Sequence, residues 1–242
     1  MTILYCKTTS DTALKLAEKL GIPSYNPYDG HVALGRPTKV IRWGVGCGIG
    51  YVPRLVLNKM KAVNNAVNKL AAIDLFNVKN VRTAARTNEV PCVGRTREHT
   101  QGQNFWLCWE EGQVETAAQE GAEYFIEYIP IKQEYRVHVI ENEVSFIQRK
   151  YPKDRVSTAF MGVQGFSNQW HKKIYTGRIS DDVKTTAINA VKALGLDFGG
   201  VDILVSMKNN KAYVAEVNTG PALHSDVVLA PYVKYFKEKL DL

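Results

Sequence analysis

Gly199-Gly-Val-Asp-Ile-Leu-Val-Ser206 and Lys211-Ala-Tyr-Val-Ala-Glu-Val-Asn218 are two apolar runs separated by the four residues Met-Lys-Asn-Asn. Runs of this length, rich in Val and Ile and joined by a short polar segment, predict a β-hairpin. The apolar residues predict its register: Val201 opposite Val217, Ile203 opposite Ala215 and Val205 opposite Tyr213, around the loop Lys208 to Asn210.

The predicted register brings two carboxylates and one amide onto the same face of the hairpin. Asp202 lies directly opposite Glu216, and Asn218 lies two residues further along the strand, facing the same side. Opposed like charges destabilise a strand pair unless something neutralises them. Hard oxygen ligands of this kind suit Mg²⁺, which typically uses one or two carboxylates together with substrate phosphates. The alternative is a solvated hairpin whose acids pair with nearby lysines.

The rest of the chain predicts helices interleaved with strands. Thr9 or Ser10 can cap a helix that runs to about Leu20 and stops at Gly21. Apolar spacing predicts further helices over residues 60–73, 183–194 and 231–240, and strands over 3–6, 40–44, 89–95, 105–109, 124–129, 134–139 and 143–149. The strand pair around Asn142 forms a second predicted hairpin. This order favours an α+β or mixed α/β fold over a purely parallel sheet.

Composition narrows the class of protein. The chain has 242 residues, of which 45% are apolar and 23% charged, a balance that excludes a disordered chain. No apolar run approaches the roughly 18 to 20 residues that span a bilayer, and no signal peptide is recognisable. Four widely spaced cysteines favour a reducing, cytoplasmic compartment. Lys and Arg outnumber Asp and Glu by 31 to 24, which suits an anionic ligand.

The motif Glu216-Val-Asn-Thr-Gly-Pro-Ala-Leu223, preceded by Gly-Val-Asp202, resembles the metal-binding end of ATP-grasp carboxylate–amine ligases of the RimK-like and glutathione-synthetase-like kind. Upstream segments extend the resemblance to about residues 58–242. They are Lys69 on the 60–73 helix, Val93-Gly-Arg95, the hinge-like Tyr124-Phe-Ile-Glu-Tyr-Ile-Pro130, Gln133-Glu-Tyr-Arg-Val-His-Val139, and Phe146-Ile-Gln-Arg-Lys150.

This resemblance implies a role for each matched residue. Backbone groups of Glu127, Tyr128 and Ile129 would hold adenine, Glu134 the ribose, Lys69 and Arg95 the phosphates, and Asp202, Glu216 and Asn218 the metal, with Arg136 and Arg149 as catalytic residues. The cofactors would be ATP and Mg²⁺, or Mn²⁺ in its place. Residues 98–104 would form a flap over the triphosphate.

The resemblance also implies a domain organisation. A short N-terminal α/β segment, residues 1–57, would precede an ATP-grasp domain, 58–242, whose two α+β subdomains (about 58–125 and 126–242) grip the nucleotide. The sequence departs from the family pattern at Arg95, where lysine is usual, and in a flap with a single glycine. An N-terminal segment of 57 residues is short for the family.

The leading hypothesis is an ADP-forming, ATP- and Mg²⁺-dependent ligase that joins a carboxylate to an amine through an acyl phosphate. Such chemistry needs positioning and charge neutralisation rather than a covalent nucleophile, and the sequence offers no Ser-His or Cys-His constellation. The basic segments 149–155 and 169–173 suggest an amino acid or peptide as substrate. The alternatives are a basic nucleic-acid-binding protein and an ATP-grasp kinase or nucleotide binder without ligation. The oligomeric state is not predicted.

Overall fold

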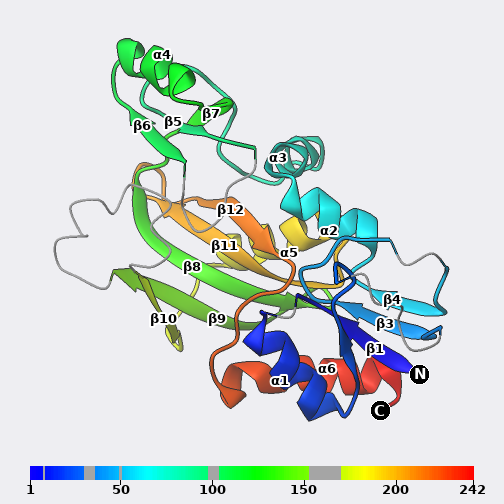
Figure 1. Cartoon of the computed structure of the whole chain (residues 1–242). Helices are drawn as coiled ribbons and strands as arrows, with labels where there is room; N and C mark the ends of the chain where they lie inside the picture. The colour runs from blue at the N-terminus through cyan, green and yellow to red at the C-terminus, as the bar shows by residue number, and fades with distance from the viewer. Residues whose placement is uncertain (8, 30–35, 49–50, 98–103, 153–169) are drawn as a thin grey trace.

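The computed structural model describes residues 1–7, 9–29, 36–48, 51–97, 104–152 and 170–242, which contain three sheets and six helices (Figure 1). The predicted flap, apart from Asn104, and residues 153–155 and 169 of the predicted substrate segments lie outside this part. None of the described helices has both the length and the apolar character that crossing a membrane requires.

A parallel four-stranded sheet is built from the first part of the chain. Its strands, in the order β2-β1-β3-β4, are β1 (Thr2–Tyr5), β2 (Ser24–Tyr25), β3 (Lys39–Arg42) and β4 (Leu55–Leu57). Helix α1 (Asp11–Leu20) begins and ends where the sequence predicts. The Ser10 side chain caps its first turn, and Gly21 ends it with a φ of 65°.

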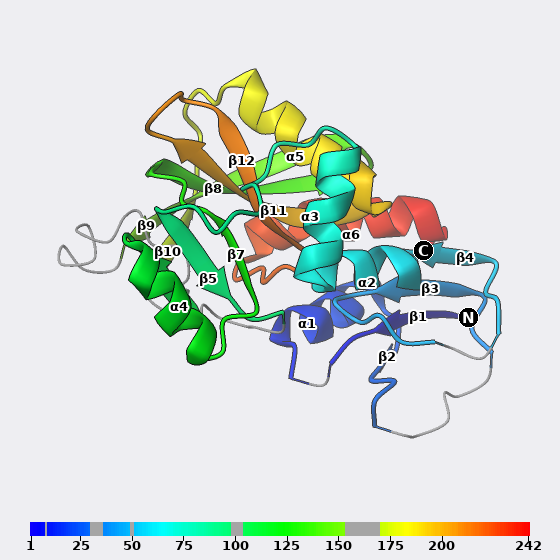
Figure 2. The same cartoon turned by 90° about the horizontal axis from the view of Figure 1, so that it is seen from above.

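The last helix, α6 (Asp226–Leu240), returns to this first sheet. It begins five residues before the predicted start at Pro231, which the helix accommodates in its second turn. Its buried face shares one apolar cluster with α1 and with Trp43, which follows β3. Figures 1 and 2 show α1 and α6 side by side, with both chain ends nearby. The N-terminal sheet is therefore covered by residues almost 200 positions away.

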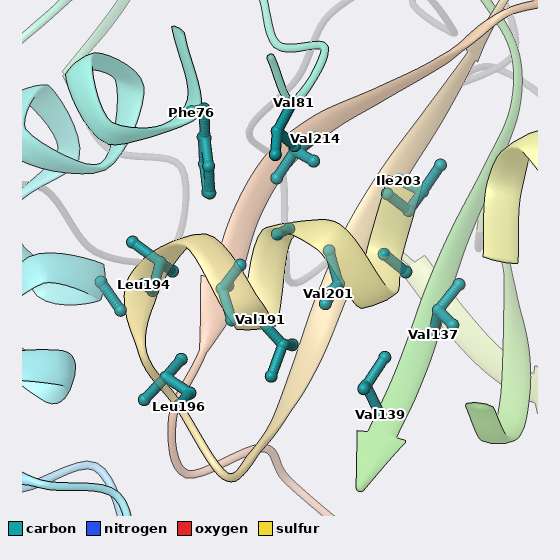
Figure 3. Packing of buried hydrophobic residues seen from close by; sticks show 14 of the residues in the cluster. Phe76, Val81, Val137, Val139, Val191, Leu194, Leu196, Val201, Ile203 and Val214 are labelled. Carbon is teal, nitrogen blue, oxygen red and sulfur yellow. The ribbon is translucent and has the colours of Figure 1, made fainter. Parts of the chain in front are cut away.

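An antiparallel five-stranded sheet forms the centre of the molecule. Its strands, in the order β10-β9-β8-β11-β12, are β8 (Ile131–Ile140), β9 (Glu143–Pro152), β10 (Trp170–Ile174), β11 (Phe198–Ser206) and β12 (Ala212–Asn218). One face packs against α5 (Asp181–Leu194) through the largest apolar cluster. Figure 3 shows Val191 and Leu194 of α5 among the apolar side chains of this cluster. The opposite face carries the polar residues described below.

A small third sheet stands apart from the N-terminal one. It has the order β6-β5-β7, from β5 (Cys92–Arg95), β6 (Phe105–Cys108) and β7 (Tyr124–Glu127), with α4 (Glu111–Gln119) packed on it. In both views this unit and the N-terminal sheet lie at opposite ends of the five-stranded sheet (Figures 1 and 2). The structure thus has the predicted mixture of helices and sheets.

The single helix predicted over residues 60–73 is wrong, because the structure has two helices there. Helix α2 (Met60–Val67) ends at Asn68, and α3 (Lys69–Val78) begins immediately after it. Asn68 has an extended backbone, and its side chain accepts a hydrogen bond from the Ala71 N–H, which caps α3. The break makes Lys69 the first residue of a new helix.

The predicted hairpin register is right at the site and wrong beyond it. Val201 pairs with Val217 and Asp202 with Glu216, but Ile203 pairs with Val214 and Val205 with Ala212. A β-bulge follows Asp202, where β12 contains the extra residue Ala215. The bulge shifts the remaining pairs by one residue, so the turn is longer than the predicted three-residue loop.

Candidate functional site

The polar face of the central sheet is organised around a buried ion pair. Asp202 of β11 lies opposite Arg136 of β8. The Arg136 Nε and Nη2 atoms donate to the two Asp202 carboxylate oxygens at 2.6 and 2.7 Å. Burial alone would raise the pKa of Asp202, but Arg136 and Lys150 hold it far below its usual value. The pair is therefore fixed in its charged state.

Two lysines on the neighbouring strands continue the row of charged side chains from this pair across the same face of the sheet. Lys150 of β9 donates to Asp202 Oδ2 at 2.8 Å and also bonds Glu134 of β8. Lys172 of β10 pairs directly with Lys150 in the ladder and so faces the same side. Burial, followed by the charge of Arg136, lowers the pKa of Lys172 to about 8. Positive charge thus accumulates on this side of the Arg136–Asp202 pair.

Glu216 and Asn218 occupy the other side of the pair, on β12. Lys69, at the first position of α3, donates to Glu216 Oε2 at 3.1 Å, and the Asn218 amide donates to Glu216 Oε1 at 3.0 Å. Burial raises the pKa of Glu216, but Lys69 and Arg136 lower it by more. The three residues predicted to hold a metal therefore lie together on one face.

Arg95 approaches the same place from the small sheet. It is 9% exposed at the end of β5, with its guanidinium 5.4 Å from the centre of the Phe105 ring. Burial lowers the pKa of the Arg95 guanidinium, and the charges of Tyr124 and Glu216 oppose that effect. Both predicted phosphate-binding residues, Lys69 and Arg95, are therefore close enough to Glu216 to interact with its charge.

The predicted adenine-binding segment connects the small sheet to the central one. The Glu127 and Tyr128 N–H groups donate to the carbonyl oxygens of Ala85 and Pro91. Ile129 is buried in an apolar cluster with Leu204, which lies opposite Glu134 and two residues beyond Asp202. One face of the sheet therefore changes from charged, at Asp202, to apolar, at Leu204.

The two predicted catalytic arginines do not lie together. Arg149 pairs with Tyr135, whose side chain belongs to the apolar cluster on the α5 face, and the Arg149 guanidinium lies 5.0 Å from the Tyr151 ring centre. A β-bulge in the β8–β9 ladder, at Ser145, shifts the pairing by one residue. Without it, Arg149 would lie opposite Glu134. With it, Lys150 takes that place.

The sequence places Lys150 and Lys172 in the two basic segments predicted to contact the substrate, and does not predict that they lie beside the Arg136–Asp202 pair. A one-residue shift in pairing moves every side chain of a strand to the opposite face of the sheet. The sequence around Ser145 contains no signal that predicts a bulge. Lys172 lies on β10, which is not among the predicted strands. Once β10 is recognised as a partner of β9, the alternation of side chains places Lys172 beside Lys150.

The site fits a metal only together with a polyphosphate. Carboxylate and amide oxygens suit Mg²⁺, but those of Asp202 and Glu216 already contact Arg136, Lys150, Lys69 and Asn218. No group of three or more His, Cys, Asp or Glu able to hold a metal occurs in the part of the chain that the structure describes. Four cations (Lys69, Arg136, Lys150, Lys172) face three carboxylates (Glu134, Asp202, Glu216), so a cation entering alone would be repelled, whereas a polyphosphate would bring compensating negative charge.

The family model for the RimK-like ATP-grasp domain matches residues 60–227. The chain belongs to the RimK-like ATP-grasp family. The probable alpha-L-glutamate ligase of Stutzerimonas stutzeri is 28% identical over an alignment of 190 residues that covers 69% of this chain and 60% of that protein. The corresponding protein of Shewanella loihica is 54% identical over 46 residues, 19% of this chain and 15% of its own length. The aligned part thus spans less than two thirds of each relative.

Solved structures share the ATP-grasp fold across the whole chain. The D-alanine–D-alanine ligase of Bacillus anthracis has a TM-score of 0.72 at 12% identity and covers 99% of this chain and 95% of its own. The D-cycloserine synthetase DcsG has a TM-score of 0.70 at 15% identity, with 99% of both chains covered. The ATP-grasp ligase PsnB, complexed with a precursor variant, Mg and ADP, has a TM-score of 0.69 at 15% identity, with 98% of both chains covered. The expected ATP-grasp fold is confirmed.

Proposed function

We propose that this RimK-like ATP-grasp chain is an ATP- and Mg²⁺-dependent ligase that joins a carboxylate to an amine and releases ADP and phosphate. The observation that carries the proposal is the arrangement around Arg136 and Asp202. Cationic side chains from three strands and from the start of α3 converge there with Glu216 and Asn218. Structural relatives crystallised with ADP and Mg support this choice of cofactors.

On the polar face of the central sheet, the side chains change from apolar at Leu204 to charged at Asp202. This change would set the direction in which the nucleotide lies. The base would lie beside Ile129 and Leu204, next to the backbone of Glu127 and Tyr128, and the ribose near Glu134. Lys69 and Arg95 would contact the phosphates, while Asp202, Glu216 and Asn218 would hold Mg²⁺. Lys150, rather than Arg149, would accompany Arg136 at the phosphate end, because it lies on the same face.

The reaction would proceed in two transfers. A carboxylate oxygen of the first substrate attacks the γ-phosphorus of ATP, the bond to the β–γ bridging oxygen breaks, and ADP leaves with an acyl phosphate formed. A neutral amine then attacks the acyl carbon, the C–O bond to phosphate breaks, and the amine loses a proton. Mg²⁺, when bound, supplies charge neutralisation at the phosphoryl oxygens. Arg136 and Lys150 supply fixed positive charge without reorganising, because Asp202 already orients them.

The substrates would be an amino acid or peptide carboxylate and an amine. This class is supported by the names of the curated relatives and by the precursor complexes of PsnB. All four cysteines are free, which supports a reducing compartment such as the cytoplasm.

The melting temperature with and without Mg²⁺-ATP tests the nucleotide site. We expect a rise of several degrees in the wild type and little or none in Glu216→Gln. The matched control Glu115→Gln changes an exposed residue of α4 and should keep the shift. ADP release that requires both carboxylate and amine would support ligation. ADP formation without an amine would indicate a kinase instead, and no shift at millimolar ATP would contradict the proposal.

A further inference from the structure

An uncharged polar side chain lies beside the Arg136–Asp202 pair on the polar face of the central sheet. Gln148 of β9 is directly opposite Arg136 in the ladder, so the two side chains face the same side. On the other side of Gln148, its partner on β10 is Ile174, which is 44% exposed. Gln148 itself is 5% exposed. It is therefore a buried amide at the point where this face opens toward solvent.

A chain of hydrogen bonds holds the Gln148 amide from behind. His138 of β8 contacts Gln148 Oε1 through Nε2 at 3.1 Å and the Tyr232 hydroxyl through Nδ1 at 2.9 Å. The His138 ring is also stacked on Phe146, with 4.0 Å between the ring centres. Tyr232 belongs to α6. The helix that covers the N-terminal sheet thus also fixes a side chain beside the proposed phosphate site.

The direction of this chain follows from the buried hydroxyl group. Burial lowers the pKa of His138 to about 3, so the ring is neutral and carries one proton. With that proton on Nε2, Tyr232 donates to Nδ1 and His138 donates to Gln148. With the proton on Nδ1, the fully buried Tyr232 O–H would have no acceptor among the described residues, which is costly. The chain therefore runs from Tyr232 through His138 to Gln148.

The amide nitrogen of Gln148 is the donor end of this chain. Because Oε1 accepts from His138, Nε2 is the part of the amide that remains available. It has no acceptor in the part of the chain that the structure describes, and it is not sealed from the surface as the indole nitrogen of Trp43 is. A donor held in one orientation, with access to the polar face, suits an oxygen atom of a ligand.

The position of Gln148 along the sheet indicates which part of a ligand it meets. The proposed base lies beside Leu204, and the charged row begins two residues away at Asp202. Two residues beyond Asp202 the face is closed, since Gly200 lies opposite the fully buried His138. Gln148 thus lies in the last open row, where the transferred phosphoryl group would meet the substrate.

We propose that the Gln148 amide donates a hydrogen bond to the acyl oxygen of the substrate, and that His138 and Tyr232 are positioning residues that hold this donor. The inference rests on the proposed ligase function and deepens it. When the amine attacks the acyl carbon, the C=O electron pair moves onto the acyl oxygen. It returns to the carbon as the C–O bond to phosphate breaks. Arg136 and Lys150 suit phosphate oxygens, which are charged throughout, whereas a fixed neutral donor suits an oxygen that becomes charged only during attack.

Two phosphonates that differ in one oxygen test this contact. Acetonylphosphonate resembles acetyl phosphate and has a carbonyl oxygen, which propylphosphonate lacks. With Mg²⁺-ADP present, calorimetry on the wild type should show about fivefold tighter binding of acetonylphosphonate, the effect of one hydrogen bond. Gln148→Met should bind both phosphonates equally. The control Gln119→Met, at an exposed position of α4, should keep the preference. A preference that survives in Gln148→Met would overturn the proposal.

Tyr232→Phe tests the positioning role, because it removes only the hydroxyl group. The preference for acetonylphosphonate should fall to about twofold, while the affinity for propylphosphonate stays unchanged. Tyr235→Phe removes a hydroxyl from the same helix, but both ring nitrogens of His138 are bonded elsewhere, so it should keep the full preference. If Tyr232→Phe weakened both phosphonates alike, its role would be structural and the positioning role would be overturned.

The tautomer of His138 provides a readout that needs no ligand. Long-range ¹H–¹⁵N spectra distinguish a protonated ring nitrogen from an unprotonated one, and we expect the proton on Nε2. A proton on Nδ1 would overturn the hydrogen-bond chain. Normal binding of Mg²⁺-ADP by a wild type that does not distinguish the two phosphonates would overturn the Gln148 contact alone. Failure to bind Mg²⁺-ADP would instead count against the proposed ligase function.

Discussion

Lys172 on β10 lies directly opposite Lys150 on β9, so two ammonium groups share one face of the central sheet. Like charges placed in this way destabilise a strand pair. The nearby carboxylates of Asp202 and Glu134 are already bonded to Lys150. A polyphosphate beside Lys172 would relieve this repulsion, which connects the stability of the strand pair to occupancy of the site.

The affinity for Mg²⁺-ADP should fall as the pH rises through about 8. Burial, together with Arg136 and Lys150, lowers the pKa of Lys172 to about 8, so its charge is lost above that pH and the phosphates lose a partner. If bound phosphate raises this pKa by one unit, complete loss of the charge weakens binding by about tenfold in total, of which about threefold falls between pH 8 and pH 9. Calorimetry at pH 7, 8 and 9 measures the change.

Lys172→Met should bind weakly and without this pH dependence. Lys173→Met is the matched control, because Lys173 pairs with Arg149 on the opposite face and is exposed. It should titrate like the wild type. A pH profile that is unchanged in Lys172→Met would show that another group is responsible.

Arg136→Met should lower the free energy of unfolding by about 3–5 kcal/mol, because it leaves the buried Asp202 without its bidentate partner. Arg136→Met/Asp202→Leu should recover part of that loss, since no buried charge remains unpaired. Urea denaturation measures both variants. Breaking the exposed pair Lys19–Asp226 should cost less than about 1 kcal/mol. Equal losses for the buried and exposed pairs would contradict this interpretation.

Stability should fall as the pH drops below about 6.5, because His138 is buried and neutral. Burial lowers its pKa to about 3, and it contacts Tyr232 and Gln148. Between pH 6.5 and 3 the unfolded chain binds more protons, so the free energy of unfolding decreases by about 1.4 kcal/mol per pH unit.

Denaturation measured between pH 5 and 7 separates the titration of this histidine from that of most carboxylates, which titrate at lower pH. His138→Gln should be less stable than the wild type at pH 7 but show a flatter profile. His224→Gln changes an exposed residue and should keep the wild-type slope. The assignment to His138 would fail if both variants kept that slope.

Asn68→Ala should cost about 1 kcal/mol, because α3 loses its N-terminal cap. Asn68→Ser keeps a capping oxygen and should remain close to the wild type. The cap fixes the point at which Lys69 enters the site, so the alanine variant should also bind Mg²⁺-ADP less tightly. Urea denaturation and calorimetry measure the two effects. Equal stability of the alanine and serine variants would show that the cap contributes nothing.

The sequence predicts the parts of this protein that depend on short-range patterns. Apolar pairing alone places Asp202 opposite Glu216, and the capping residues Ser10 and Gly21 define α1. The family resemblance then indicates the ATP-grasp fold and a set of site residues, including Arg136. These features follow from residues that are neighbours along the chain or across one hairpin.

The features that sequence reasoning missed depend on single-residue shifts and on long-range pairing. Bulges at Ala215 and Ser145 move the register by one residue, and the second decides that Lys150 rather than Arg149 faces Asp202. The break at Asn68 has only a weak local signal, since asparagine also occurs inside helices. Lys172 is placed beside Lys150 only by the pairing of β10 with β9, which the sequence does not predict.

The packing of α6 on the N-terminal sheet has a consequence for the order of folding. During synthesis, residues 1–57 emerge before residues 226–240, which complete the apolar face formed by Leu4, Ile41 and Trp43. Contacts of such wide sequence separation form slowly. The first sheet therefore keeps an uncovered apolar surface throughout translation of the central sheet, and a nascent chain paused before residue 226 should be a substrate for chaperones.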